Sequence, residues 1–178
     1  GKVYDLHVVL DDYEINATSK LNVAVPLEDT FFFAPSTAEQ DSLGYISNTY
    51  TDPDTLGNAY RWSSMRINHY PPWHRLAGMK KDNAFIYPQG SPFDDSFING
   101  QEITFYMYRY PSEFDAPNAP SGFWEKGDTV LVRLESIDQA AFDAVMSFES
   151  AYSAQGNPFA PPTNVLSNIE GGLGWWIA

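Results

Sequence analysis

Apolar and polar residues alternate through the first part of the chain. Between Val3 and Leu10 an apolar side chain recurs at every second position, and a second alternating run covers residues 13–18 after Asp11 and Asp12. A period of two is typical of a strand with one covered face, and a separation of two residues is typical of a tight hairpin turn. Aspartate tolerates the left-handed backbone that such a turn requires. The pattern predicts a β-hairpin that turns at Asp11-Asp12.

Six further strands are predicted from short runs rich in aromatic and β-branched residues, each bounded by Gly, Pro, Asn or Asp. They cover residues 30–34, 43–49, 59–69, 84–87, 102–110 and 129–134. In the run at 102–110, Ile103, Phe105 and Met107 share one face, while tyrosines share the other. Because no helical pattern separates the strands, we expect antiparallel pairing.

One helix is predicted towards the C-terminus. Ser136 and Gln139 have the spacing of a capping box, and apolar residues recur at helical intervals from there to Tyr152. Gly156 and Pro158 then provide a stop signal. The fold class predicted is therefore mainly β: an antiparallel β-barrel or β-sandwich of about eight strands, with one C-terminal α-helix lying on a sheet.

The segment 157–178 combines prolines, glycines and two adjacent indoles, and it contains no evident catalytic group. Proline favours an extended backbone, so residues 158–162 are expected to be extended. Gly171, Gly172 and Gly174 allow the backbone to turn with positive φ or to pass close to another group. We interpret this tail as a structural element and not as a catalytic one.

Composition limits the class of protein. The 178 residues, 43% of them hydrophobic, fit a single domain covering 1–178. The net charge of −13 argues against nucleic acid and against an anionic membrane surface as partners.

The chain has no cysteine, which excludes disulfides, thiol nucleophiles and thiolate zinc sites. It shows no signal peptide and no long apolar stretch, and the opening Gly1-Lys2-Val3 indicates a piece of a longer protein.

Two acidic segments are candidates for a calcium site and for a catalytic site. Residues 52–58 have oxygen-bearing side chains at alternate positions, but the twelfth position, which is acidic in a calcium loop, is Ser63, and this favours a turn. Asp94 and Asp95 could form a catalytic carboxylate pair, but the following Asn99-Gly100 favours a hairpin.

Nucleophilic and metal sites find little support in the sequence. His69 and His74 flank a diproline without the spacing of a known zinc motif, and no nucleophile elbow or phosphate-binding loop occurs. We therefore expect no enzyme activity, no cofactor and no metal.

Aromatic residues in two Pro/Gly-rich connections are the best candidates for a binding site. Trp73 and Trp124 are expected to be exposed because such loops lie on the surface. Together with Tyr70 and Phe123, they are the predicted ligand-binding residues, which would stack on a glycan or a peptide. A loop indole that folds back over the core is the alternative.

Short motifs follow one another in a definite order along nearly the whole chain. The distinctive ones are Asn157-Pro158-Phe159 and the run Ser167-Asn168-Ile169-Glu170-Gly171-Gly172-Leu173-Gly174, while Asp52-Pro53 and Asn99-Gly100 are weaker signals. The series resembles the C-terminal portion of domain-of-unknown-function family 4249. Trp175-Trp176 departs from the smaller or single aromatic residue expected after the final glycine.

The resemblance implies a cell-surface lipoprotein of Bacteroidota, lipid-anchored in the outer membrane and associated with TonB-dependent receptors. An Ig-like region would lie upstream, and residues 1–25 could be its end. The expected function is a non-catalytic binding or accessory module in TonB-dependent nutrient uptake. The alternative is a protein-interaction module that docks on an outer-membrane receptor through its tail. A hydrolase is a remote third reading that rests on the available carboxylates alone.

Overall fold

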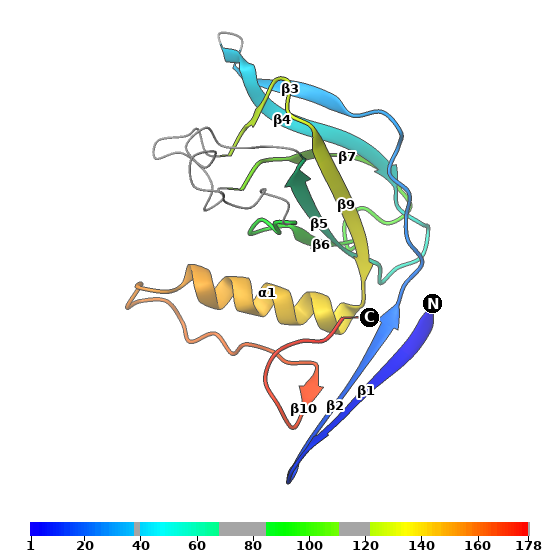
Figure 1. Ribbon diagram of the computed structural model, residues 1–178, viewed down its shortest axis with the longest axis vertical. Helices are drawn as coiled ribbons and strands as arrows, with labels where there is room; N and C mark the ends of the chain where they lie inside the picture. The colour runs from blue at the N-terminus through cyan, green and yellow to red at the C-terminus, as the bar shows by residue number, and fades with distance from the viewer. Residues whose placement is uncertain (38–39, 68–84, 111–121, 178) are drawn as a thin grey trace, which may run out of the picture.

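The computed structural model describes residues 1–37, 40–67, 85–110 and 122–177 (Figure 1). These residues form ten strands in three antiparallel sheets, together with one α-helix. The prediction of a mainly β, antiparallel fold with a helix near the C-terminus is confirmed. No sheet closes on itself within the described ranges, so the arrangement agrees with the sandwich alternative and not with the barrel.

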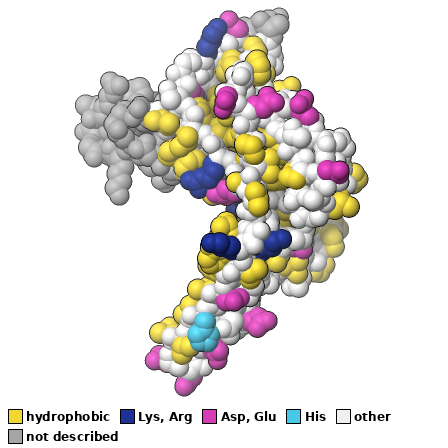
Figure 2. Space-filling view, turned by 90° about the vertical axis from the view of Figure 1, so that its right-hand side faces the viewer, with side chains coloured by type: hydrophobic (Ala, Val, Ile, Leu, Met, Phe, Trp, Pro, Cys, Tyr) yellow, Lys and Arg dark blue, Asp and Glu magenta, His cyan; other side chains and the backbone are white. Residues whose placement is uncertain are grey.

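The predicted N-terminal hairpin is present. Strand β1 (Lys2–Leu10) pairs with β2 (Tyr13–Leu21) in a register that runs from Leu10 opposite Tyr13 to Lys2 opposite Leu21. Asp11 adopts a φ of 52°, as the two-residue turn requires. The hairpin extends away from the rest of the molecule, and acidic side chains gather towards its tip (Figures 1 and 2).

Two central sheets form the body of the domain. The β4 sheet contains β3 (Phe32–Thr37), β4 (Gln40–Thr51) and β7 (Glu102–Met107), and the short β8 (Trp124–Glu125) also pairs with β4. The β5 sheet has the order β6 (Pro92–Asp94), β5 (Ala59–Arg66) and β9 (Val130–Ile137).

An aromatic cluster joins the two central sheets. Tyr50 and Phe105 come from the β4 sheet, while Tyr60 and Phe93 come from the β5 sheet. The ring centroids of Tyr50 and Tyr60 are 5.5 Å apart, and those of Tyr60 and Phe93 are 5.4 Å apart. Phe105 lies 5.9 Å from Tyr50 in an edge-on arrangement. Both tyrosine side chains are buried, so this cluster is the core of the sandwich.

Strand boundaries differ from the predictions mainly at the ends. The predicted strand at 59–69 ends at Arg66 in the structure, and the one at 102–110 ends at Met107. Of the predicted strand 84–87, the described part contributes a single bridge, between Ile86 and Ser64. Strands β6, β8 and β10 (Ile169–Glu170) were not predicted, because two or three residues are too few to show a period.

The helix α1 (Gln139–Ser153) begins two residues later than the predicted capping box implies. Its N-cap is Asp138, whose Oδ1 accepts a hydrogen bond from the Ala141 N–H at 2.7 Å. Ser136 could not cap the helix because it is still part of β9, opposite Tyr60 on β5. The second oxygen of Asp138 accepts from the Ser19 hydroxyl at 2.6 Å, so the same carboxylate holds the hairpin against the helix.

The C-terminal tail returns to the hairpin. In β10, Ile169 pairs with Ala17 of β2, and the following Gly171 has a φ of 77°. A Cβ atom on Gly171 would lie 2.1 Å from the Glu14 carbonyl oxygen. The expectation that these glycines allow positive φ and a close approach is confirmed. Further along, the Asn168 side chain bonds both the N–H and the carbonyl of Trp176, which closes the tail into a loop.

The close approach at Gly171 can be tested by comparison with Gly156. Gly156 has a similar φ of 81° but no heavy atom near its missing Cβ. Gly156→Ala should cost about 1 kcal/mol of unfolding free energy, because it only strains the backbone. Gly171→Ala should cost clearly more, since the methyl group also meets the Glu14 carbonyl. Urea denaturation measures both, and equal losses would contradict the tight packing of the tail on β2.

The two buried tyrosines of the aromatic cluster differ in their hydroxyl groups. The Tyr60 hydroxyl donates a hydrogen bond to Oδ1 of the buried Asp52, whereas the Tyr50 hydroxyl has no partner in the described part of the chain. Burial, and then the hydrogen bond to Asp52, raises the pKa of Tyr60, so this hydroxyl stays a donor well above neutral pH.

Tyr60→Phe should therefore lower the free energy of unfolding by about 2 kcal/mol, because it leaves a buried carboxylate oxygen without its donor. Tyr50→Phe should leave stability unchanged or raise it, because it removes a buried hydroxyl that lacks a partner. Chemical denaturation at pH 7 distinguishes the two variants. A Tyr50→Phe loss as large as that of Tyr60→Phe would show that the hydrogen bond is not the cause.

Candidate functional site

The structure describes two of the four predicted ligand-binding residues. Tyr70 and Trp73 lie outside the described residues, as do His69 and His74. The expectation that Trp124 is exposed is wrong: its side chain is 3% exposed, and its Nε1 donates to the Met107 carbonyl at 3.1 Å. Its backbone pairs with Gly44 as part of β8, and this short pairing turns the indole into the protein.

Phe123 lies beside Trp124 and is half-buried. Its ring centroid is 5.2 Å from that of Tyr45, and its carbonyl accepts a hydrogen bond from Nε of Arg109 at 3.0 Å. The segment that was expected to be a surface loop therefore packs along β4 at this point.

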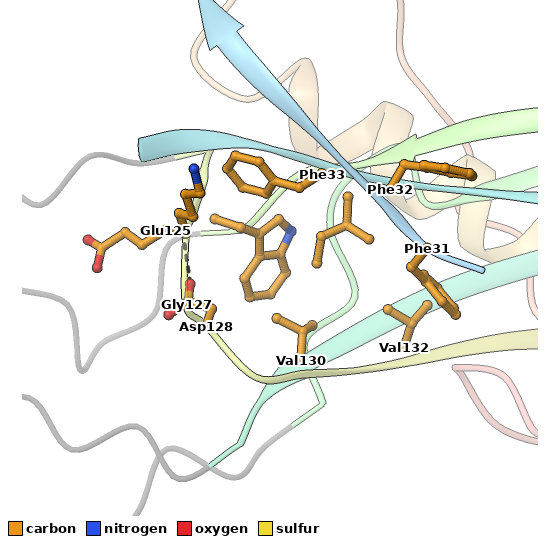
Figure 3. A pocket seen from close by; sticks show the side chains of 11 residues that line it. Phe31, Phe32, Phe33, Glu125, Gly127, Asp128, Val130 and Val132 are labelled. Carbon is orange, nitrogen blue, oxygen red and sulfur yellow. Dashed lines mark hydrogen bonds between the residues drawn. The ribbon is translucent and has the colours of Figure 1, made fainter. Parts of the chain in front are cut away.

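A pocket of about 390 Å³ opens next to Trp124, between the start of β3 and the connection from β8 to β9 (Figure 3). We call it the aromatic pocket. Its lining consists of Phe31, Phe32, Phe33, Ile46, Trp124, Glu125, Lys126, Gly127, Asp128, Val130 and Val132. Figure 3 shows Val130 and Val132 pointing into the pocket from β9, with Phe31 opposite them and Glu125 directed away. The buried indole of Trp124 is thus part of a pocket wall.

Strand alternation explains these walls. Val130 and Val132 face inwards, while Leu131 between them is 44% exposed. Across the pocket, Phe33 packs against Gly44 of β4, where a Cβ atom would lie 2.8 Å from the phenyl ring and 2.2 Å from the Ala34 carbonyl oxygen. A glycine is needed at position 44 for β3 to lie this close to β4.

The rim on the β8–β9 side is fixed by one carboxylate. Oδ2 of Asp128 accepts from Nη2 of Arg66 at 2.7 Å and from the Glu125 N–H at 2.9 Å. The two charged side chains are 8% and 11% exposed, so solvent screens this ion pair only weakly. Lys126 N–H in turn donates to the Ser42 carbonyl at 2.8 Å. The rim is therefore rigidly attached to both central sheets.

The chemistry of the aromatic pocket is that of a binding site. Its described walls are apolar apart from three ionisable side chains, those of Glu125, Lys126 and Asp128, which lie in or next to the connection from β8 to β9. Among the described lining residues there is no hydroxyl, thiol or imidazole group. Apolar walls with a few polar groups at the mouth are typical of a site that holds an apolar part of a ligand.

The acidic segments weighed from the sequence are structural turns. Asp52 accepts from the Tyr60 hydroxyl and from the Gly100 N–H, and Asp95 accepts from the backbone N–H groups of Gly57 and Asn58 at 3.1 and 2.9 Å. Both carboxylates are buried within these bonds. Across the described ranges, no group of three or more His, Asp or Glu side chains is arranged to hold a metal ion.

Comparison with protein families gives one match. The sequence model of a family described as a domain of unknown function (DUF4249) matches residues 1–178, which is the whole chain. The chain belongs to the DUF4249 family. No curated protein and no solved structure matches this DUF4249 chain. No helix in the described part of it is long and apolar enough to cross a membrane.

Most of the aromatic pocket was missed by reasoning from the sequence. The run Phe31-Phe32-Phe33 was a visible signal, because three consecutive large apolar residues cannot all face inwards on one strand. Phe31 and Phe32 are 44% and 61% exposed. Val130 and Val132 could not be recognised as pocket residues from the sequence, because a strand that packs in the core would show the same pattern of apolar residues.

Proposed function

We propose that this DUF4249 domain is a non-catalytic binding module that holds an apolar group of its ligand in the aromatic pocket. The observation that carries the proposal is the open pocket between the two central sheets, whose walls are phenyl, indole and branched aliphatic groups. An apolar group that leaves water for such walls gains roughly 25 cal/mol per Å² of buried surface. The rigid rim described above keeps the pocket open before the ligand arrives, which lowers the entropy cost of binding.

A peptide is the ligand class that fits this pocket better than a glycan. A sugar needs several hydrogen-bond partners for its hydroxyls, and the inner walls offer none. A peptide can insert one apolar side chain while its backbone stays at the rim, near the charged groups of Glu125 and Lys126. The two rim residues are exposed and carry opposite charges, which suits the mixed polarity of a peptide backbone.

The proposal also includes a location and a biological role. We propose that the domain belongs to a lipid-anchored surface protein of the outer membrane and assists TonB-dependent nutrient uptake. Membership of the DUF4249 family supports this location and role, because the resemblance to that family implies a surface lipoprotein associated with TonB-dependent receptors. The net charge of −13 is compatible with it, since this charge disfavours binding to anionic lipid and to nucleic acid.

The pocket assignment can be tested by filling the pocket. Val132→Phe adds a ring inside the cavity, whereas Leu131→Phe adds the same ring at the next position of the strand, on the exposed face. Blocked tripeptides with a central Phe, Leu or Gly serve as probes in calorimetry. We expect the Phe and Leu peptides to bind the wild type better than the Gly peptide, and Val132→Phe to weaken them about tenfold or more. Leu131→Phe should bind like the wild type, and equal affinities in all three proteins would refute the pocket.

A second candidate function, docking on a receptor through the tail, is favoured by two exposed apolar side chains. Phe159 is 91% exposed and Leu173 is 95% exposed, and both belong to the C-terminal segment. Large apolar side chains held in water are common at protein interfaces.

The docking function can be tested with Phe159→Ser and Leu173→Ser in the full-length protein. Phe97, which is also 91% exposed but lies outside the tail, provides the control Phe97→Ser. If the tail docks, the two tail variants should lose a TonB-dependent receptor that co-purifies with the wild type from outer membranes, and the control should retain it. Retention by all three variants would remove the tail from the interaction.

A further inference from the structure

Arg61 is a half-buried cation with an unusual environment. It lies on β5, with Glu135 of β9 and Pro92 of β6 as its strand neighbours. Its guanidinium carbon is 4.1 Å from the centroid of the Tyr87 ring, a distance typical of a cation–π contact. The Tyr87 hydroxyl donates to both oxygens of Glu135, at 2.9 and 3.1 Å, which fixes the ring beneath the guanidinium.

No anion neutralises Arg61 directly. Within residues 1–37, 40–67, 85–110 and 122–177, its side chain has no hydrogen bond and no ion pair, and its Nε atom is buried. By contrast, Arg66 pairs with Asp128 and Arg133 with Glu135, both in the same β5 sheet. Burial lowers the pKa of Arg61, as expected for a cation that has lost part of its hydration.

The nearest acidic side chains are already engaged elsewhere. Glu135 accepts from Tyr87 and from Arg133, the latter at 3.0 Å, and Glu149 of α1 accepts from the Gly90 N–H at 2.7 Å. Their charges act on Arg61 from a distance without forming a contact. A cation that is partly removed from water and lacks an anionic partner is destabilising, and a bound anion would relieve that cost.

Arg61 and Tyr87 are shared by two cavities. One, of about 190 Å³, lies towards α1 and the tail, and its wall includes the rings of Tyr110, Phe148 and Trp175. The other, of about 500 Å³, lies towards β9 and the end of the hairpin, and it is lined by Ser136, whose buried hydroxyl has no partner in the described part of the chain. Among the described residues, neither cavity shares a lining residue with the aromatic pocket, so this is a separate site.

The lining groups match the chemistry of an acidic sugar. The planar guanidinium can hold a carboxylate through two parallel hydrogen bonds, and aromatic rings such as those of Tyr110 and Trp175 can stack on the C–H face of a sugar ring. Gln89 and Glu149 line the same cavity. Within the described residues, Gln89 Nε2 is bonded to Ser153 and Glu149 Oε2 to the Gly90 N–H, which leaves Oε1 of each side chain to accept from sugar hydroxyls. We propose that the Arg61 site binds a uronic-acid residue of a glycan, with its carboxylate on Arg61.

The local charge favours a carboxylate over a doubly charged phosphate. Arg133 is paired with Glu135, whereas Arg61 has no ion pair in the described part of the chain and meets Glu135 and Glu149 only as distant charges. A carboxylate brings one negative charge to Arg61, whereas a phosphate brings two and is repelled more strongly by the two glutamates. A peptide carboxylate carries the right charge, but it lacks the ring and the hydroxyls that the aromatic wall, Gln89 and Glu149 can receive.

The experiment compares acidic trisaccharides with neutral ones of the same shape. Trimers of galacturonic, glucuronic and mannuronic acid, and their methyl esters, are titrated into the wild-type protein by calorimetry and tryptophan fluorescence. At least one acid should bind, and its ester should bind about tenfold more weakly or worse, because it has lost the charge that meets Arg61. This comparison needs no mutation, so it does not depend on the folding of a variant.

Substitutions then assign the effect to Arg61. Arg61→Gln should weaken the acid about 10- to 100-fold, and Arg61→Lys should weaken it less because it keeps the charge without the planar fork. Lys2→Gln, which removes a positive charge from the exposed strand β1, should bind like the wild type. The thermal midpoint of Arg61→Gln should match or exceed that of the wild type, since an unpaired charge has been removed.

Several outcomes would overturn the proposal. Failure of all three acids to bind, equal affinity for acid and ester, or unchanged affinity in Arg61→Gln would each do so. Tighter binding of the tripeptide Gly-Gly-Tyr than of any acidic trisaccharide, lost in Arg61→Gln, would assign the site to peptide carboxylates and would equally refute the sugar.

Discussion

The packing of four aromatic rings between the two central sheets is the interaction on which the rest of this domain depends. In the described part of the chain, the β4 and β5 sheets are joined by ring contacts among the buried Tyr50 and Tyr60 and the half-buried Phe93 and Phe105. Rings of this size bury much apolar surface, but tyrosine also carries a hydroxyl into the core. For Tyr60 that hydroxyl is satisfied by Asp52, which in turn holds Gly100 at the entry to β7. The core and the turns at its edge are therefore fixed together.

Some of the acidic residues of this chain hold the fold together, and the others lie on its surface. Asp52 and Asp95 hold turns, Asp128 holds the rim of the aromatic pocket, and Asp138 joins the hairpin to α1. Each of these carboxylates accepts at least one hydrogen bond from a backbone N–H group. The net charge of −13 thus overstates how much negative charge faces solvent, because several of the carboxylates are internal.

The sequence was sufficient to predict the fold class but not the candidate sites. The hairpin followed from alternation and the Asp11-Asp12 turn, and the helix from its apolar period, because both signals are local. The position of Trp124 did not follow, since a loop-like composition concealed the two-residue strand that turns its indole inwards. The N-cap of the helix was predicted at the wrong residue because Ser136 pairs with Tyr60 in the β5 sheet, and no local sequence pattern indicates this pairing. The aromatic pocket and the Arg61 site are built from residues far apart in the chain, and their proximity depends on sheet pairing.

The pairing of β10 with β2 has a consequence for biosynthesis. Translation proceeds towards the C-terminus, so both strands of the hairpin leave the ribosome before β10, the third strand of their sheet. Until Ile169 and Glu170 emerge, the backbone of β2 at Ala17 and Asn16 is open to any extended segment nearby. The last contact to form is also one of long sequence separation, which slows folding. Such a chain would benefit from a holding chaperone that covers this nascent edge until translation has passed the tail.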